Sequence, residues 1–151
     1  MRTLLEVKAA YDEVDALIQR RLAEAIASGD ATLEAEWSFR KDATDYAYFV
    51  VIFAQLERIV KAKFVEARDR RRQNLDWTQR RLWDADVFSG EKIPFSTVLA
   101  AVLDRQSAPY RSVISYYQER NRIAHGGLTA SVGSIDVFVQ DISLIVAHLR
   151  A

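Results

Sequence analysis

The spacing of hydrophobic residues along this chain is that of helices. From Leu4 to Ala27 they recur every three or four residues, which places them on one face of a helix. They are Leu4, Val7, Tyr11, Val14, Ile18, Leu22 and Ala25. Gly29 is a natural end for this helix. A polar and aromatic segment over 30–40 follows, and the pattern leaves open another helical turn or two around Trp37.

A second long helix is predicted from Asp42–Asp45 to about Arg72. The small oxygen-bearing side chains at its start can accept hydrogen bonds from the free N–H groups of a helix terminus. The first part is rich in β-branched and aromatic residues, a composition that also suits a strand. However, the helical spacing continues through Phe64 without a breaker, so we interpret the segment as one helix, buried on most sides at its start. Its charged end over 68–72 is expected to lie in solvent.

The remainder of the chain predicts shorter helices separated by loops. They are expected over 77–86, over 97–104, from Pro109 to the glycine pair Gly126–Gly127, and over 134–149. Asp76 and Ser96 are the expected N-caps of the first two, and Pro109 suits the first turn of the third. Segments 88–94 and 106–109 are expected loops. The predicted fold is an all-α bundle of about five to six helices, with two long antiparallel helices, in a single domain over residues 1–151.

Composition narrows the class of protein. Half of the residues are hydrophobic and seven are Gly or Pro, which favours an ordered helical chain. The absence of cysteine excludes disulfides and thiolate sites, and two histidines far apart in sequence argue against a His-based metal site, so we expect no metal and no cofactor. The chain has no signal-like start and no apolar run near the roughly 20 residues of a membrane span. We therefore expect a cytoplasmic protein without a membrane partner.

Charge is balanced overall, with 21 basic and 21 acidic residues, but it is unevenly distributed. Residues 57–81 carry nine basic and four acidic side chains, a net charge of +5. A positive segment of this kind can contact a polyanion even when the whole chain is neutral.

Candidate catalytic side chains are concentrated over 119–127, where the sequence is Glu-Arg-Asn-Arg-Ile-Ala-His-Gly-Gly. Asn121 and His125 are four apart and share a helix face, and the long side chain of Arg120 can lean back across the turn. Arginine offers a fixed positive fork to phosphate oxygens, and an imidazole can act as a general acid or base near neutral pH. Asn121 can orient either partner. The alternative is that His125 only caps the helix or interacts with its dipole.

The run Arg120–Gly126 resembles the motif of the HEPN superfamily, the higher-eukaryote and prokaryote nucleotide-binding domains. That motif has an arginine, a polar residue that is usually asparagine, three further residues and a histidine, and this chain matches it without a gap. The order of long and short helices, with the motif late in the chain, is also similar. Outside the motif the agreement is one of architecture alone.

The resemblance implies a metal-independent endoribonuclease, or a relative that has lost activity. His125 would act as general base on the ribose 2′-OH or as acid on the leaving 5′ oxygen, Arg120 would stabilise the phosphorane, and Asn121 would hold the geometry. The products would be a 2′,3′-cyclic phosphate and a 5′-OH, and RNA would be the substrate because the reaction needs a 2′-OH. Active members pair as homodimers in which both motifs face a shared cleft.

The implied biological role is that of a toxin or defence effector restrained by an antitoxin or other regulatory protein. The alternative is a non-catalytic dimeric module that binds nucleotide, RNA or a partner protein. Some family toxins carry a tyrosine two residues after the histidine that an antitoxin modifies. In this chain that position is Gly127, so this form of control is not expected.

Further RNA contacts are hypothesised outside the motif. They are Arg122, Tyr117, Arg70, Arg71 and Arg72. The arginines over 70–72 would bind phosphates without sequence specificity, although such a run is most often a solvated helix end. Tyr117 either stacks on a base or belongs to the core. Trp83 is expected in the core and His148 in a structural role.

Overall fold

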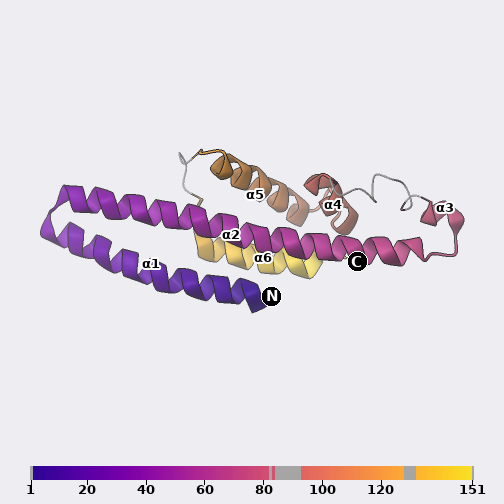
Figure 1. The fold of residues 1–151 in the computed structure, drawn as a ribbon, viewed down its shortest axis with the longest axis horizontal. Coiled ribbons are helices and arrows are strands. Elements are labelled where there is room, and N and C mark those ends of the chain that lie inside the picture. Colours follow the sequence, from indigo (N-terminus) through magenta and orange to yellow (C-terminus); the bar gives the residue numbers. More distant parts are fainter. Residues whose placement is uncertain (1, 82, 84–92, 128–131, 151) are drawn as a thin grey trace. The chain divides into compact units, whose positions relative to one another are not determined.

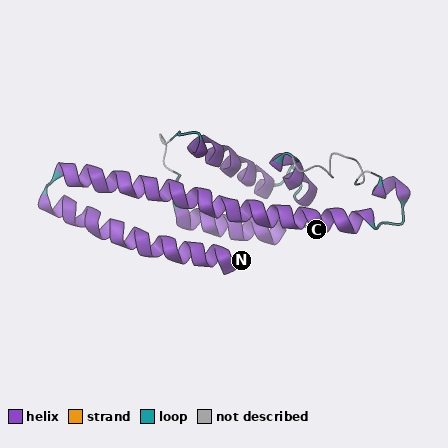
Figure 2. Cartoon of the chain, viewed as in Figure 1, coloured by secondary structure: helices purple, strands orange, loops and turns teal. Residues whose placement is uncertain are grey.

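The computed structural model describes residues 2–81, 83, 93–127 and 132–150, and within these ranges it contains six helices and no strand (Figures 1 and 2). The helices are α1 (Arg2–Ser28), α2 (Ala31–Arg72), α3 (Trp77–Arg80), α4 (Phe95–Val102), α5 (Ala108–Ala124) and α6 (Ile135–His148). The predicted all-α fold is confirmed. No helix among these residues is long and apolar enough to cross a membrane.

The chain forms two compact units. The first comprises Met1–Gln55 and Gln118–Gln140, and the second comprises Leu56–Tyr117 and Asp141–Ala151. Helices α2, α5 and α6 each contribute residues to both. The single domain expected over 1–151 stays a prediction.

In the first unit, α1 and the first part of α2 form an antiparallel hairpin (Figure 1). The buried residues of α1 recur every seven positions, which gives one continuous stripe along the helix. They are Leu4, Tyr11, Ile18 and Ala25, and α2 contributes Tyr46, Phe49, Ile52 and Phe53. The ring of Phe49 stacks on that of Phe138 in α6, with 4.4 Å between centroids. The first part of α6 therefore packs against the hairpin within the first unit.

The turn between α1 and α2 explains where both helices begin and end. Gly29 has φ of +70° and its N–H donates to the carbonyl of Ile26 at 3.1 Å, which confirms the predicted end of α1. Asp30 caps α2, because its Oδ1 accepts from the N–H groups of Thr32 and Leu33 at 3.0 and 3.1 Å. The hairpin thus needs a connection of only two residues.

The predicted start of α2 at Asp42–Asp45 is therefore wrong, although its predicted end at Arg72 is confirmed. Residues 31–40 are helical and almost all exposed, with Trp37 half-buried. An exposed helix shows no apolar stripe, so its sequence looks like a linker. Asp45 is not a cap but faces α1 across the hairpin.

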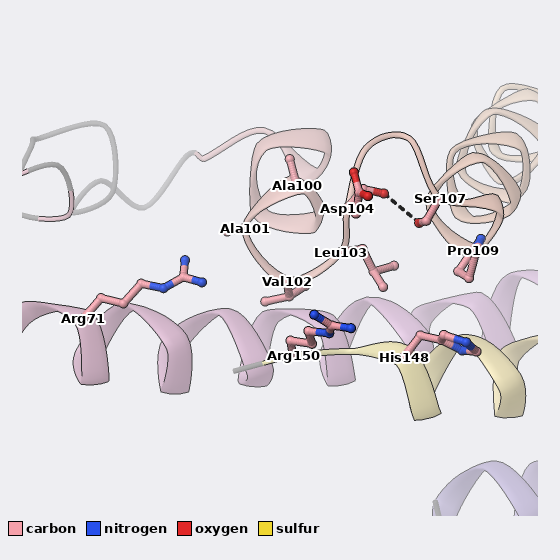
Figure 3. Close-up of a pocket in the computed structure, with 10 residues that line it drawn as sticks. All are labelled: Arg71, Ala100, Ala101, Val102, Leu103, Asp104, Ser107, Pro109, His148 and Arg150. Carbon is pink, nitrogen blue, oxygen red and sulfur yellow. Dashed lines mark hydrogen bonds between the residues drawn. The ribbon is translucent and has the colours of Figure 1, made fainter. Parts of the chain in front are cut away.

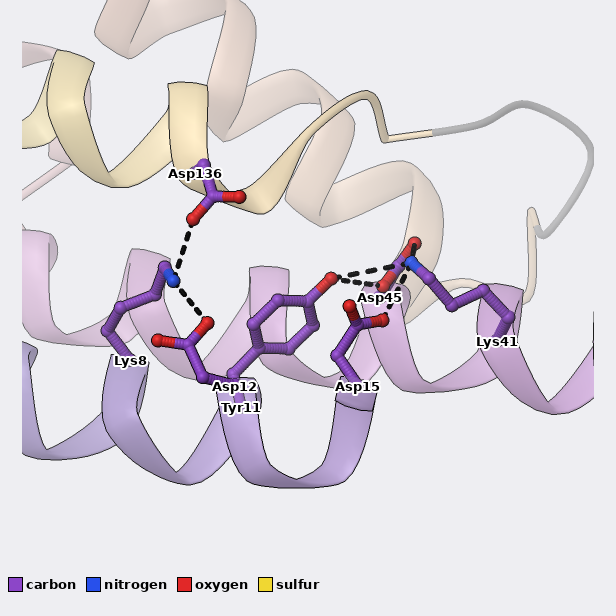
Figure 4. Close-up of polar contacts among 7 residues, drawn as sticks. All are labelled: Lys8, Tyr11, Asp12, Asp15, Lys41, Asp45 and Asp136. Atoms are coloured by element: carbon purple, nitrogen blue, oxygen red, sulfur yellow. Dashed lines mark hydrogen bonds and ion pairs between the residues drawn. The ribbon is translucent and has the colours of Figure 1, made fainter. Parts of the chain in front are cut away.

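A polar network crosses the hairpin (Figure 4). The Tyr11 hydroxyl donates to Asp45 at 2.9 Å, and Lys41 forms ion pairs with Asp45 at 2.5 Å and with Asp15 at 3.3 Å. Burial and the bond to Asp45 raise the pKa of Tyr11. Burial lowers the pKa of Lys41, but the bonds to Asp45 outweigh it and leave that pKa raised. Tyr11 therefore stays neutral and Lys41 stays positively charged in this network, which links α1 to α2.

A second ion pair joins α1 to α6 within the same unit. Lys8 bonds to Asp12 one turn along α1 and to Asp136 of α6, the latter at 2.7 Å (Figure 4). The Lys8 side chain is 16% exposed and that of Asp136 is 64% exposed, so water screens this pair from the side of α6. The ion pair links α1 to α6, whereas the stacked rings of Phe49 and Phe138 link α2 to α6.

In the second unit, the start of α3 confirms one predicted cap and the start of α4 corrects another. Asp76 Oδ1 accepts from the Thr78 N–H at 2.8 Å, as expected of an N-cap. The structure ends α3 at Arg80, whereas residues 84–86 of the predicted helix lie outside the described residues, as do 88–92 of the predicted loop. Helix α4 begins at Phe95 without a side-chain cap, so the cap predicted at Ser96 is wrong. Pro94 precedes the helix, and its carbonyl accepts the first helical bonds.

The two remaining helices match their predictions closely. Pro109 lies in the first turn of α5, and the Ser107 hydroxyl caps that helix by accepting from the Tyr110 N–H at 3.2 Å. Helix α6 ends at His148, one residue before the predicted end. The core of the second unit comprises Leu56, Val60, Phe64, Val98, Leu99, Val113, Ile142 and Ile145.

Candidate functional site

The motif lies at the C-terminal end of α5, which finishes in a Schellman motif. Gly126 has φ of +86°, and its N–H donates to the carbonyl of Ile123 at 2.9 Å. The N–H of Gly127 donates to the carbonyl of Arg122, also at 2.9 Å. This pair of bonds defines a Schellman motif, and the left-handed conformation of Gly126 strongly favours glycine at that position. The end predicted at Gly126–Gly127 is confirmed.

Gly127 is required for a steric reason. A Cβ atom at this position would lie 2.8 Å from Arg122 Cγ and 2.9 Å from the Arg122 carbonyl oxygen. Any side chain would therefore push against the backbone of the preceding turn. The tyrosine that some family toxins carry at this position has no room here without a shift of the helix end.

Arg120 and Asn121 are in direct contact. The Nη1 atom of Arg120 donates to Oδ1 of Asn121 at 2.9 Å, and both side chains are half-buried. Asn121 also accepts the backbone N–H of His125 through its carbonyl, at 3.1 Å. The side-chain bond is the contact that the orienting role predicted for Asn121 needs. It restricts the guanidinium to a small range of positions beside the helix end.

His125 is the residue at the end of α5, and its side chain is exposed. Over the described ranges, no hydrogen bond or ion pair engages its imidazole. The other histidine behaves differently, because Nδ1 of His148 lies 2.8 Å from the carbonyl of Leu144 in its own helix. Among the described residues, the His125 side chain therefore caps no carbonyl of α5, and its ring is exposed.

Arg122 bonds to groups before and after it at the end of α5. Its Nε donates to Glu119 at 2.9 Å, Nη2 bonds to the second oxygen of the same carboxylate, and Nη1 bonds to the carbonyl of Gly127. The bonds from Arg122 lower the pKa of Glu119, and the carboxylate in turn raises the pKa of Arg122. An RNA contact by Arg122 competes with these bonds, so that role stays a prediction.

The other hypothesised RNA contacts belong to the second unit. The ring of Tyr117 packs on that of Phe95, with 5.0 Å between centroids. The guanidinium of Arg71 lies 4.3 Å from the centroid of the Trp83 ring, and Arg72 donates to the carbonyl of Trp83 at 2.9 Å. Arg70 is exposed, as expected for a solvated helix end.

Trp83 was expected in the core, but it is half-buried and contacts Arg71 and Arg72 at the basic end of α2. Sequence reasoning missed this contact because the tryptophan follows Arg72 by eleven residues and shares no helical spacing with it. A cation–π contact carries no periodic signal.

The structure thus brings Arg120 and Asn121 together, with His125 one turn further along the helix, all in the first unit. The described residues contain no group of three or more His, Asp or Glu side chains that could hold a metal ion. Comparison with protein-family models, with curated proteins and with solved structures finds no match to this chain. The family resemblance therefore rests on residues 120–126, and membership stays a prediction.

Proposed function

We propose that this chain is a metal-independent endoribonuclease whose catalytic residues are Arg120, Asn121 and His125. One observation carries the proposal. An arginine that donates to an asparagine precedes, by five residues, an exposed imidazole that forms no hydrogen bond or ion pair with the residues that the structure describes. A purely structural histidine at a helix end is expected to bond to a carbonyl, as His148 does.

The reaction follows from the chemistry of these groups. As general base, His125 takes the proton of the ribose 2′-OH, and the 2′ oxygen attacks the adjacent phosphorus. The bond from phosphorus to the 5′ oxygen breaks, and that oxygen receives a proton from a general acid. The products are a 2′,3′-cyclic phosphate and a 5′-OH. Arg120 stabilises the negative charge that builds on the phosphorane, while Asn121 keeps its guanidinium in place.

This reaction needs both a base and an acid, whereas the motif supplies one imidazole. A two-fold homodimer that brings two motifs to one cleft provides the second, because a symmetric interface places the same residue on both sides. We therefore propose a homodimer with a composite site. The hypothesised phosphate contacts at Arg70, Arg71 and Arg72 add affinity without reading sequence.

The test is cleavage of a mixed tRNA and mRNA pool in EDTA by wild type, Arg120→Ala and His125→Ala. Ser115→Ala, an exposed position on the same helix, is the matched control. We expect wild type and control to generate cyclic-phosphate ends, and each motif variant to be at least about 100-fold slower. Equal cleavage by wild type and His125→Ala would exclude the proposed base. Absence of cleavage at protein concentrations that bind RNA would exclude the nuclease for those substrates.

A second candidate is a non-catalytic dimeric module that binds nucleotide or RNA or serves as an adaptor for a partner protein. The observation in favour of the adaptor is the number of exposed large hydrophobic side chains on the hairpin of α1 and α2, since such side chains mark protein contacts when they gather. They include Val14, Leu17, Ile26, Leu33 and Phe39, with exposed fractions of 38–66%. Expression in bacteria separates the two candidates. A toxin restrained by an antitoxin is poorly tolerated alone and tolerated as His125→Ala, whereas an adaptor is tolerated equally in both forms.

A further inference from the structure

The second unit contains a hollow of about 380 Å³ where the ends of α2, α4 and α6 meet the start of α5 (Figure 3). This volume is in the range of small-molecule sites. The hollow is lined by Arg71, Ala100, Ala101, Val102, Leu103, Asp104, Ser107, Pro109, His148 and Arg150. None of these residues belongs to the motif at the end of α5, so the hollow is a separate candidate site.

Basic side chains from two elements face this hollow. Arg71 extends from α2, and His148 and Arg150 come from the end of α6, opposite Asp104 and Ser107 (Figure 3). Within the described ranges, neither Arg71 nor Arg150 forms an ion pair with a carboxylate. The guanidinium of Arg71 lies over the ring of Trp83, a contact that uses the face of the group and leaves its N–H edge for an anion, as in Arg150. Arginine matches phosphate oxygens with paired hydrogen bonds.

Asp104 is the carboxylate on the lining, and the local turn already uses it. Its Oδ1 accepts the backbone N–H of Gln106 at 2.9 Å. The Ser107 hydroxyl donates to the Asp104 carbonyl at 2.6 Å and accepts from the N–H of Tyr110. Ser107 thereby fixes the start of α5 at the edge of the hollow. The partial positive charge of that helix terminus adds to the charge of the arginines.

Two further contacts hold the basic side of the hollow in place. The backbone N–H of Arg150 donates to the carbonyl of Val102 at 3.0 Å, which ties the segment after α6 to the end of α4. Nδ1 of His148 lies 2.8 Å from the Leu144 carbonyl and so carries the proton that it donates. Nε2 of His148 is then the ring nitrogen left for a ligand. The site therefore has a fixed backbone and a preset imidazole.

We propose that this hollow binds a small phosphate-bearing organic ligand, with Arg71 and Arg150 on its phosphate group and His148, which lies beyond Arg150 at the other end of the lining, on its organic part (Figure 3). The apolar part of the lining, at Val102, Leu103 and Pro109, gives the organic part of the ligand a surface to pack on. A mononucleotide combines both chemical features. The site lies in the second unit and does not depend on the proposed nuclease function.

Calorimetric titration of the full chain at low salt tests the proposal, with AMP, inorganic phosphate and adenosine as separate probes. The variants are Arg71→Gln and Arg150→Gln, which remove charge but keep most of the side-chain length at exposed positions. Arg105→Gln is the matched control, because it removes the same charge from an exposed residue of the same unit that does not line the hollow. Arg120→Ala reports on any binding at the motif. Thermal unfolding confirms that each variant is folded.

We expect saturable 1:1 binding of AMP, a loss of affinity of at least about tenfold in each of the two variants, and wild-type affinity in Arg105→Gln. Tighter binding of AMP than of phosphate supports a contribution from the organic part, and equal binding supports recognition of phosphate alone. Adenosine that binds as tightly as AMP would overturn the proposal. So would binding lost in Arg120→Ala but kept in Arg71→Gln and Arg150→Gln, or binding of an RNA oligonucleotide with no binding of AMP or phosphate in the millimolar range.

Discussion

At the scale of single residues, the two glycines at the end of α5 have different reasons to be glycine. Gly126 has open space around it but needs φ of +86°, whereas Gly127 is crowded by the backbone and side chain of Arg122. Asparagine tolerates the left-handed conformation better than most residues, so Gly126→Asn is expected to be the milder change. The helix end that presents His125 depends on both positions.

Gly127→Ala is therefore expected to destabilise the protein. Its Cβ forces Arg122 or the last turn of α5 to move, and overpacking of this kind costs about 1–3 kcal/mol. Urea unfolding of wild type, Gly127→Ala and Gly126→Asn measures the difference. Because the same movement displaces the neighbouring His125, RNA cleavage is expected to fall as well. An unchanged unfolding midpoint for Gly127→Ala would show that the helix end has room that the structure does not contain.

The ion pair of Glu119 and Arg122 predicts a dependence of stability on pH. The folded state lowers the pKa of Glu119, so the pair stabilises the protein above the pKa of the unfolded chain, about 4.3, and this stabilisation is lost as pH falls through the lower folded pKa. Glu119→Gln should therefore unfold at a lower temperature than wild type at pH 7. The gap should narrow as the solution is acidified below pH 4. A gap that stays constant with pH would assign the effect to something other than this carboxylate.

At the scale of elements, the helices predicted best from the sequence are those whose buried residues recur at a regular spacing. The stripe from Leu4 to Ala25 predicted α1, and the spacing through Phe64 predicted α2 against the competing strand interpretation. The start of α2 was missed because residues 31–40 are exposed, and an exposed helix leaves no hydrophobic period in the sequence. Asp30 can cap a helix, but the oxygen-bearing side chains over 42–45 can do the same, and the apolar spacing that follows them favoured the later start.

The candidate site was predictable for a different reason. Arg120, Asn121 and His125 are close in sequence, so one helix end is enough to bring them near each other. The cation–π contact between Arg71 and Trp83 depends on tertiary structure, and so does the hollow near Arg150. Local spacing contains no information about either. The bonds from Arg122 to Glu119 and to the Gly127 carbonyl were likewise not predicted from the sequence, and the RNA contact predicted for Arg122 stays a prediction.

The hairpin of α1 and α2 should depend on its polar network more than on its surface ion pairs. Lys41, whose side chain is 20% exposed, forms ion pairs with both Asp15 and Asp45. Its removal leaves both half-buried carboxylates without a cation, although Asp45 keeps the hydrogen bond from Tyr11. We expect Lys41→Met to cost roughly 1–3 kcal/mol. Arg21 forms an exposed pair with Glu24, with 53% and 55% of the side chains exposed, so Arg21→Met is the control and should cost under about 1 kcal/mol. Equal costs in chemical unfolding would mean that the network adds nothing beyond surface pairing.

At the scale of the whole molecule, the balanced charge and the single motif lead to the same expectation. A neutral protein gains little from long-range attraction to RNA, so its affinity must come from local patches such as the basic end of α2. One imidazole per motif gives a monomer half of the acid and base pair that the proposed reaction uses. Pairing of two copies supplies the missing group.

A composite site of this kind predicts that cleavage requires a dimer in which both copies of His125 are intact. Specific activity should fall on dilution through the same concentration range in which analytical ultracentrifugation detects dissociation. When wild type is mixed and re-equilibrated with an equal amount of His125→Ala, random pairing leaves a quarter of the dimers with two intact motifs, so total activity should fall to about one half of that of wild type alone. An equal amount of inert protein should leave activity unchanged. Activity that is unaffected by the variant would assign both proton transfers to a single chain, and the second proton carrier would then have to lie close to His125 in the same copy.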